Sequence, residues 1–142
     1  MAHWLLLITN LPGRNQTLRM RLWRALKAAG SASLRDGVYL LPSSDIACRV
    51  FESQAAQMQS ARGSAHVLSF EAESAAQQRA LQALFDRATD YVGIMARLAA
   101  WRRKLAKLDA PAARRGLEAL RRDMAQVVRS DFFPGASRQQ VE

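Results

Sequence analysis

Residues 4–8, Trp-Leu-Leu-Leu-Ile, form an uninterrupted apolar run close to the start of the chain, and this run limits the possible folds more than any other feature. An apolar run without alternation is typical of a strand that is buried on both faces of a sheet. Five residues fall far short of the ~20 that a membrane-spanning helix needs. No basic segment precedes the run, so it is also a poor signal peptide. The run predicts the central strand of a sheet.

The next sixty residues alternate between helical and extended patterns. Asn15 can cap a helix over 16–29, in which the leucines repeat at helical spacing and Gly30 provides the stop. A strand is expected over about 33–41, with a short extra strand near 31–34 and a bulge or break at Gly37. Ser44 can cap a second helix that runs to about residue 62, and residues 65–71 read as a third, half-buried strand.

The second half of the chain is predicted to be helical. Residues 74–108 contain no proline and one glycine, Gly93, and their apolar residues repeat at near-heptad spacing, which predicts a single long helix with a bend at Gly93. Asp109 and Pro111 start a final helix to about residue 129, so the two helices form an antiparallel hairpin. Residues 131–135 form an aromatic turn before a polar tail.

These elements predict an α+β fold: a ferredoxin-like β-α-β-α-β layer with a C-terminal antiparallel helical hairpin. We expect residues 1–73 to form the layer and residues 74–130 to form a hairpin packed on it as one folding unit. Residues 131–142 are the turn and tail. At 142 residues the chain is long enough for one domain with a core that needs no disulfide or metal.

Charge is the unusual part of the composition. The chain has 21 Lys and Arg against 12 Asp and Glu, for a net charge of +9, and eighteen of the basic residues are arginine. Residues 1–35 hold six basic side chains and no acid, and residues 97–129 hold ten against three acids. Arginine favours bidentate contacts with phosphate, so nucleic acid is the first partner to consider. The alternative is that these charges form solvated faces without a partner.

No catalytic or metal-binding constellation is evident. Cys48 lies within a predicted helix and is interpreted as a packed small residue, and His66 as a core histidine of the third strand. His3 lies near the terminus, and the neighbouring Glu71 and Glu73 fall in a polar turn. We therefore expect no enzyme activity, no metal and no cofactor. The loop at 11–14 leads into a helix N-terminus, where Arg14 and free N–H groups could bind an oxyanion; a plain structural turn is the alternative.

Much of the sequence resembles the N-terminal domain of the ChrB-type chromate resistance proteins. The likeness is carried by residues 4–7, 11–12, 19–27, 30 and 34–42, and by the segment 131–135 that closes that domain. The run RDGVYLLP at 35–42 is its most specific part. The resemblance covers residues 4–135, almost the whole chain.

Members of that family are chromate-responsive transcriptional regulators that act beside a chromate efflux transporter, and their N-terminal part binds DNA. The resemblance therefore implies a cytoplasmic regulator that binds double-stranded promoter DNA as a homodimer. The second basic block adds two residues to the six matched positions. The predicted DNA contacts are Arg14, Arg19, Arg21, Arg24, Lys27, Arg35, Arg102 and Arg103.

Family members usually continue into a second domain, whereas this chain ends at Glu142, so we expect a stand-alone N-terminal-domain form without any sensing function housed there. A more distant likeness links the chain to the small CRISPR adaptation proteins and to the middle domain of PaaX-type repressors. The nucleases among them hold a metal with an aspartate where this chain has Asn10, which disfavours a metal-dependent nuclease. A protein-interaction or dimerisation module accessory to chromate resistance is the other alternative.

Overall fold

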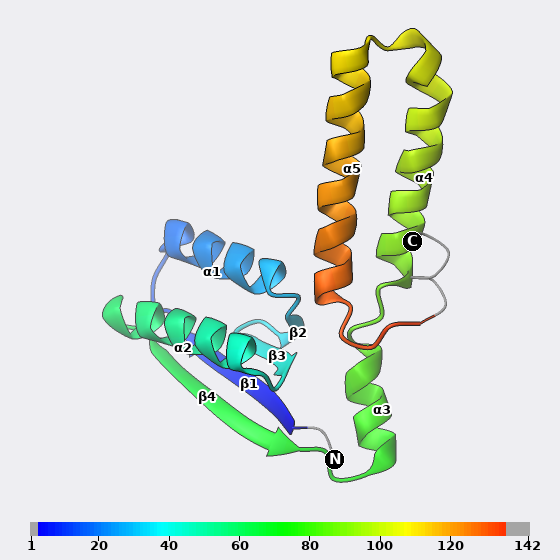
Figure 1. Ribbon diagram of the computed structural model, residues 1–142. Helices are drawn as coiled ribbons and strands as arrows, with labels where there is room; N and C mark the ends of the chain where they lie inside the picture. The colour runs from blue at the N-terminus through cyan, green and yellow to red at the C-terminus, as the bar shows by residue number, and fades with distance from the viewer. Residues whose placement is uncertain (1–2, 136–142) are drawn as a thin grey trace. The chain divides into compact units, whose positions relative to one another are not determined.

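The computed structural model describes residues 3–135 and divides the chain into two compact units, Met1–Phe85 and Asp86–Glu142. Within the described residues the protein is α+β, with a four-stranded antiparallel sheet and five α-helices (Figure 1). None of the described helices is long and apolar enough to cross a membrane.

The first unit is built on the sheet. Its strands are β1 (His3–Asn10), β2 (Ala32–Arg35), β3 (Val38–Pro42) and β4 (Ser64–Glu71), arranged in the order β2-β3-β1-β4 with every neighbouring pair antiparallel. The apolar run at 4–8 lies in β1, between β3 and β4, and Trp4, Leu5 and Leu7 are buried. The prediction of a central strand is confirmed.

The predicted extra strand is also confirmed, because β2 and β3 are separate strands joined by a turn at Asp36 and Gly37. Gly37 has a φ of +82°, a left-handed conformation that glycine adopts without steric cost. Its carbonyl oxygen accepts a 2.7 Å hydrogen bond from the backbone N–H of Thr9, which ties the turn to the end of β1. The β2–β3 pairing shifts register between Ser33 and Arg35, as expected of a bulge.

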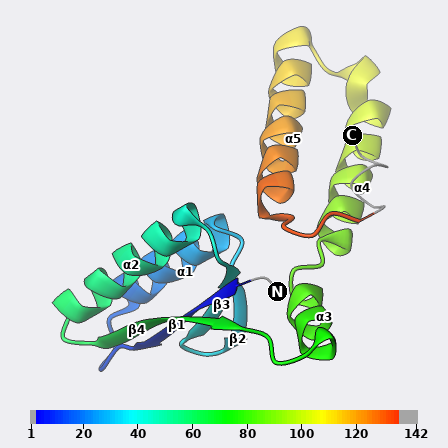
Figure 2. The same ribbon diagram turned by 60° about the horizontal axis from the view of Figure 1, so that its bottom comes forward.

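Two helices cover one face of this sheet, α1 (Gln16–Ala28) and α2 (Asp45–Ser60) (Figures 1 and 2). Both start at the caps that the sequence predicts: the side chains of Asn15 and Ser44 accept hydrogen bonds from the backbone N–H of Leu18 and Ala47. The leucine stripe of α1, at positions 18, 22 and 26, is buried. Burial of this stripe fixes which side of α1 remains in solvent.

The single long helix expected over 74–108 is wrong. The chain instead forms α3 (Ala75–Ala83), α4 (Ala88–Lys104) and a 3₁₀ turn, η1 (Leu105–Lys107). The break lies at residues 84–87, not at Gly93, which is inside α4. Phe85 is 1% exposed and its ring stacks on Trp4 at 5.8 Å between centroids. Burial of this ring stabilises the break between α3 and α4. Helix α4 then begins at Ala88, whose backbone N–H donates a hydrogen bond to the Asp86 carboxylate.

The second unit is the predicted antiparallel hairpin of α4 and α5 (Ala110–Ser130). Gly116 of α5 lets the helices approach closely, because a Cβ there would lie 2.8 Å from the Trp101 ring. At the other end, the Tyr91 hydroxyl donates a 2.7 Å hydrogen bond to the buried Asp131. The packing of the hairpin on the first unit stays a prediction, and the predicted tail from residue 136 lies outside the described residues.

Candidate nucleic-acid interface

Helix α1 presents three cations on its solvent side, Arg21, Arg24 and Lys27, which we call the α1 surface. All three are exposed, and they point away from the buried leucine stripe. Lys27 also places its Nζ 4.7 Å from the centroid of the Trp23 ring, a cation–π contact that stiffens this part of the surface. The sequence predicted each of these positions from helical periodicity alone.

Arg19 lies on the same helix but has a different environment. It is half-buried, and its Nη2 donates 2.8 Å hydrogen bonds to the carbonyl oxygens of Leu11 and Gly13. These bonds pin the loop that leads into α1. Arg19 therefore has a structural role that periodicity did not reveal, and its contact with DNA stays a prediction.

The two remaining cations of the first basic block lie outside α1. Arg14 is exposed in the loop before the helix, and Arg35 is exposed at the end of β2. At the helix start, the N–H of Gln16 donates to the Arg14 carbonyl oxygen, and the N–H of Leu18 donates to the Asn15 side chain. Because these N–H groups already have acceptors, they add no support to the predicted oxyanion site, which stays a prediction.

The end of the hairpin carries the densest group of cations among the described residues. Arg102 and Arg103, both predicted, lie in the last turn of α4. Four further cations surround the connection to α5, and all six side chains are exposed. We call the six the hairpin tip: Arg102, Arg103, Lys104, Lys107, Arg114 and Arg115.

Little negative charge offsets the hairpin tip. Asp109 is the single acid between positions 102 and 115, and its carboxylate already accepts a hydrogen bond from the N–H of Ala112. The carbonyl end of α4 favours cations in its last turn, which stabilises Arg102, Arg103 and Lys104 there. Like charges at this density repel one another in the free protein, and an anion placed among them would relieve that repulsion.

Sequence reasoning missed four of these cations as site residues, namely Lys104, Lys107, Arg114 and Arg115. Their signal was present as two basic clusters, residues 102–104 and 114–115, with Lys107 between them. The predicted hairpin already turned at Asp109, but only Arg102 and Arg103 of these clusters were predicted as contacts. The 3₁₀ turn and the cap at Asp109 reverse the chain and gather them at one end of the hairpin.

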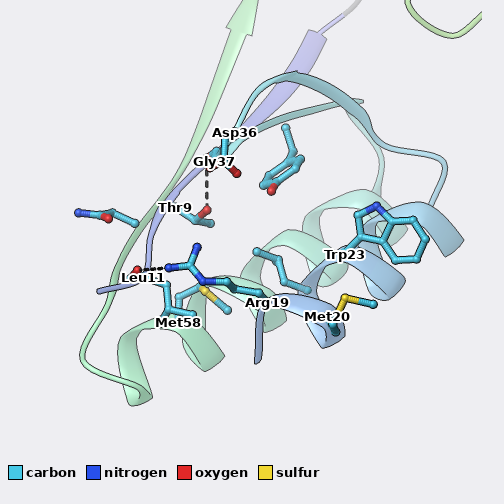
Figure 3. Close-up of a pocket in the computed structure, with 11 residues that line it drawn as sticks. Thr9, Leu11, Arg19, Met20, Trp23, Asp36, Gly37 and Met58 are labelled. Carbon is cyan, nitrogen blue, oxygen red and sulfur yellow. Dashed lines mark hydrogen bonds between the residues drawn. The ribbon is translucent and has the colours of Figure 1, made fainter. Parts of the chain in front are cut away.

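A pocket of about 700 Å³ opens beside α1 in the first unit (Figure 3). It lies between the end of β1, helix α1 and the β2–β3 turn, and Arg19, Trp23, Asp36 and Tyr39 are among its lining residues. Burial raises the pKa of the Tyr39 phenol, a backbone hydrogen bond at Gly37 opposes that shift, and the nearby Asp36 carboxylate adds to it. The phenol is therefore protonated at neutral pH and available as a donor.

The histidines and the other residues considered as catalytic or metal-binding candidates do not lie together in the described part of the chain. His66 is exposed on β4, so its interpretation as a core histidine is wrong: its side chain lies on the opposite face of the strand from the buried Ala65. His3 pairs with Glu71 at 3.1 Å, and both side chains are largely exposed. Asn10 is the last residue of β1 and lines the pocket. Across residues 3–135, no group of three or more His, Cys, Asp or Glu side chains is placed to hold a metal ion.

Cys48 is expected to react slowly with alkylating reagents, and Glu52→Gln to speed the reaction severalfold. The Cys48 thiol donates a 3.3 Å hydrogen bond to the Glu52 carboxylate, and this bond is the main cause of a raised Cys48 pKa. The thiolate is the reactive form, so removal of the carboxylate increases its fraction at neutral pH. Iodoacetamide labelling followed by mass spectrometry measures this rate; equal rates for the two proteins would contradict the assignment.

Comparison with known proteins identifies the family of this chain. The family model described as "Protein ChrB, N-terminal" matches residues 19–141. Over 139 residues the chain is 35% identical to Protein ChrB of Cupriavidus metallidurans, an alignment that covers 98% of this chain and 43% of that relative. No solved structure matches. The chain thus spans less than half the length of its curated relative, and it belongs to the ChrB N-terminal family.

Proposed function

We propose that this chain binds double-stranded DNA as the DNA-binding part of a transcriptional regulator of the chromate-resistance type. One observation carries the proposal: six exposed cations of the hairpin tip stand against a single acid, which is already hydrogen-bonded as a helix cap. Membership of the ChrB N-terminal family supports the link to chromate resistance. The α1 surface supplies a second group of cations with the same exposure.

In this proposal the phosphate backbone supplies most of the affinity. Each Lys or Arg that neutralises a phosphate releases a counterion, so log K falls by about 0.9 per contact for each tenfold increase in salt. Arginines at the hairpin tip suit bidentate contacts with phosphate or with guanine. In this proposal the hairpin tip and the α1 surface contact DNA independently, and each is tested with its own variants.

We infer a ferredoxin-like layout for the first unit. The element order β-α-β-β-α-β, the strand order β2-β3-β1-β4 and the two helices on one face support it. We also propose that the protein acts as a cytoplasmic homodimer, because a two-fold dimer would match palindromic DNA. Light scattering at several protein concentrations tests this, and a monomer at every concentration would contradict the dimer.

The double variant Arg21→Ala plus Arg24→Ala is expected to weaken binding to promoter DNA at least tenfold while the protein remains folded. Both side chains are exposed and point away from the buried leucines of α1, so their loss removes charge without opening the core. A mobility-shift assay with the DNA upstream of the chain's own gene measures the binding. Thermal unfolding followed by circular dichroism provides the control for folding.

The wild-type protein in that assay tests whether the chain binds DNA at all. Wild-type protein should shift the duplex at low salt, and added salt should release it. If the wild-type protein does not bind any duplex at low salt, DNA binding is excluded as the function of this chain. If it binds and the α1 variant binds equally well, the contact lies elsewhere on the surface, with the hairpin tip as the next site to test.

A further inference from the structure

The pocket beside α1 includes Arg19 but none of the cations of the α1 surface or the hairpin tip. At about 700 Å³ it falls within the ~300–1,000 Å³ range of small-molecule sites. Figure 3 shows Arg19, Met20 and Trp23 along the helix side, and Asp36 and Gly37 on the opposite side. Apolar side chains, including Leu22 and Met58, complete the lining.

Arg19 supplies a fixed cation in this pocket. Its Nη2 is held by the carbonyl oxygens of Leu11 and Gly13, each at 2.8 Å, so the guanidinium is already oriented before a ligand arrives. Among residues 3–135, no carboxylate forms a direct ion pair with Arg19, although Asp36 lines the same pocket. A guanidinium has five N–H donors, and those not used by the loop suit an anionic oxygen group.

Trp23 provides a flat aromatic surface in the same pocket, on the other side from the Arg19 guanidinium, which points toward Leu11 (Figure 3). It follows Arg19 by four residues and therefore lies on the same side of α1. The Trp23 side chain is 52% exposed, although tryptophan is usually well buried, and it lines the pocket.

Hydrogen-bond acceptors occupy the opposite side of the pocket. Asp36 is exposed at the β2–β3 turn, and its carboxylate lies close enough to Tyr39 to influence the phenol. The amide of Asn10 adds a donor and an acceptor at the end of β1. A carboxylate accepts hydrogen bonds from two adjacent N–H groups, and guanine presents such a pair on its Watson–Crick edge. Adenine presents a donor beside an acceptor on that edge, so it fits a carboxylate less well.

We propose that this pocket binds a guanine nucleotide, with the phosphate on Arg19, the base stacked on Trp23 and the base edge on Asp36. The same chemistry is offered by a free mononucleotide and by an unpaired guanine nucleotide within a strand. The site adjoins the α1 surface, because Lys27 of that surface contacts the Trp23 ring, and it can be tested without duplex DNA.

Titration of the wild-type protein with guanosine 5′-monophosphate, followed by calorimetry and by tryptophan fluorescence, tests the site. We expect saturable binding, with quenching of Trp23 fluorescence on stacking. Adenosine 5′-monophosphate should bind more weakly, as should guanosine and inorganic phosphate. A short G-containing single-stranded oligonucleotide forms the second arm: tighter binding of the oligonucleotide identifies the strand as the natural source of the nucleotide.

Two variants and one control make the assignment specific. Trp23→Leu should weaken nucleotide binding roughly tenfold, which is typical for loss of base stacking. Asp36→Asn should remove the preference for guanine over adenine, and asparagine still suits the turn. Arg49→Gln, an exposed change on α2 outside the pocket, should bind like the wild type. Unfolding curves should show that all three proteins are folded.

Three results would overturn the proposal. The first is that neither the mononucleotide nor the oligonucleotide binds at millimolar concentration. The second is that guanosine or inorganic phosphate binds as tightly as the nucleotide, because base and phosphate would then not both contribute to the affinity. The third is that Trp23→Leu and Asp36→Asn bind the nucleotide like Arg49→Gln.

Discussion

Replacement of Arg102, Arg103 and Arg115 by glutamine is expected to weaken binding to duplex DNA on the order of a hundredfold near physiological salt. All three side chains are exposed at the hairpin tip, where the neighbouring acid, Asp109, is already used as a cap. Each lost phosphate contact should lower the slope of log K against log salt by about one. Fluorescence anisotropy with a labelled duplex at several salt concentrations measures both quantities.

A matched variant separates a local contact from a general effect of net charge. Arg49, Arg79 and Arg129 are also exposed, and they lie outside both the hairpin tip and the α1 surface. Their replacement by glutamine removes the same three charges and should change the affinity severalfold at most. If the two triple variants lose affinity equally, the hairpin tip has no special role and binding follows net charge alone.

Gly37→Ala is expected to destabilise the first unit by about 3 kcal/mol. Gly37 has a φ of +82°, which an alanine adopts only with strain, and the new Cβ would lie 2.6 Å from the carbonyl oxygen of Thr9. The clash is with backbone, so it can be relieved only if the β2–β3 turn moves away from β1 and weakens the 2.7 Å hydrogen bond from Thr9. Urea unfolding followed by tryptophan fluorescence measures the change in the free energy of unfolding.

Two other glycines provide controls for that experiment. Gly13 has a φ of +77° but open space around its Cβ direction, so Gly13→Ala should cost only the backbone strain, about 1 kcal/mol. Gly93 lies inside α4 with nothing within 4 Å, so Gly93→Ala should stabilise that helix by about 1 kcal/mol. Equal losses for Gly13→Ala and Gly37→Ala would show that the close approach to Thr9 contributes nothing.

Local signals in the sequence predicted most of the elements correctly. The apolar run at 4–8 identified the central strand, and Asn15 and Ser44 marked the starts of α1 and α2 because their side chains cap the first backbone N–H groups. The leucine stripe of α1 showed in advance which cations face solvent. These features depend on residues that are close in sequence, so they can be read without the fold.

Features that depend on distant residues were missed or misread. Nothing near Phe85 in the sequence stops a helix; the break there is stabilised by the contact of Phe85 with Trp4, 81 positions away. Arg19 lies at the border of the leucine stripe, and periodicity does not reveal that its guanidinium reaches back to the loop at Leu11 and Gly13. His66 has apolar neighbours in sequence, but it lies on the opposite face of β4 from the buried Ala65 and is exposed.

The salt dependence of duplex binding by the wild-type protein tests the central claim most directly. If the hairpin tip and the α1 surface neutralise phosphates, affinity should fall steeply, with a slope of log K against log salt of about −4 or steeper. A duplex affinity that barely changes as salt is raised, or no affinity even at low salt, would contradict the account.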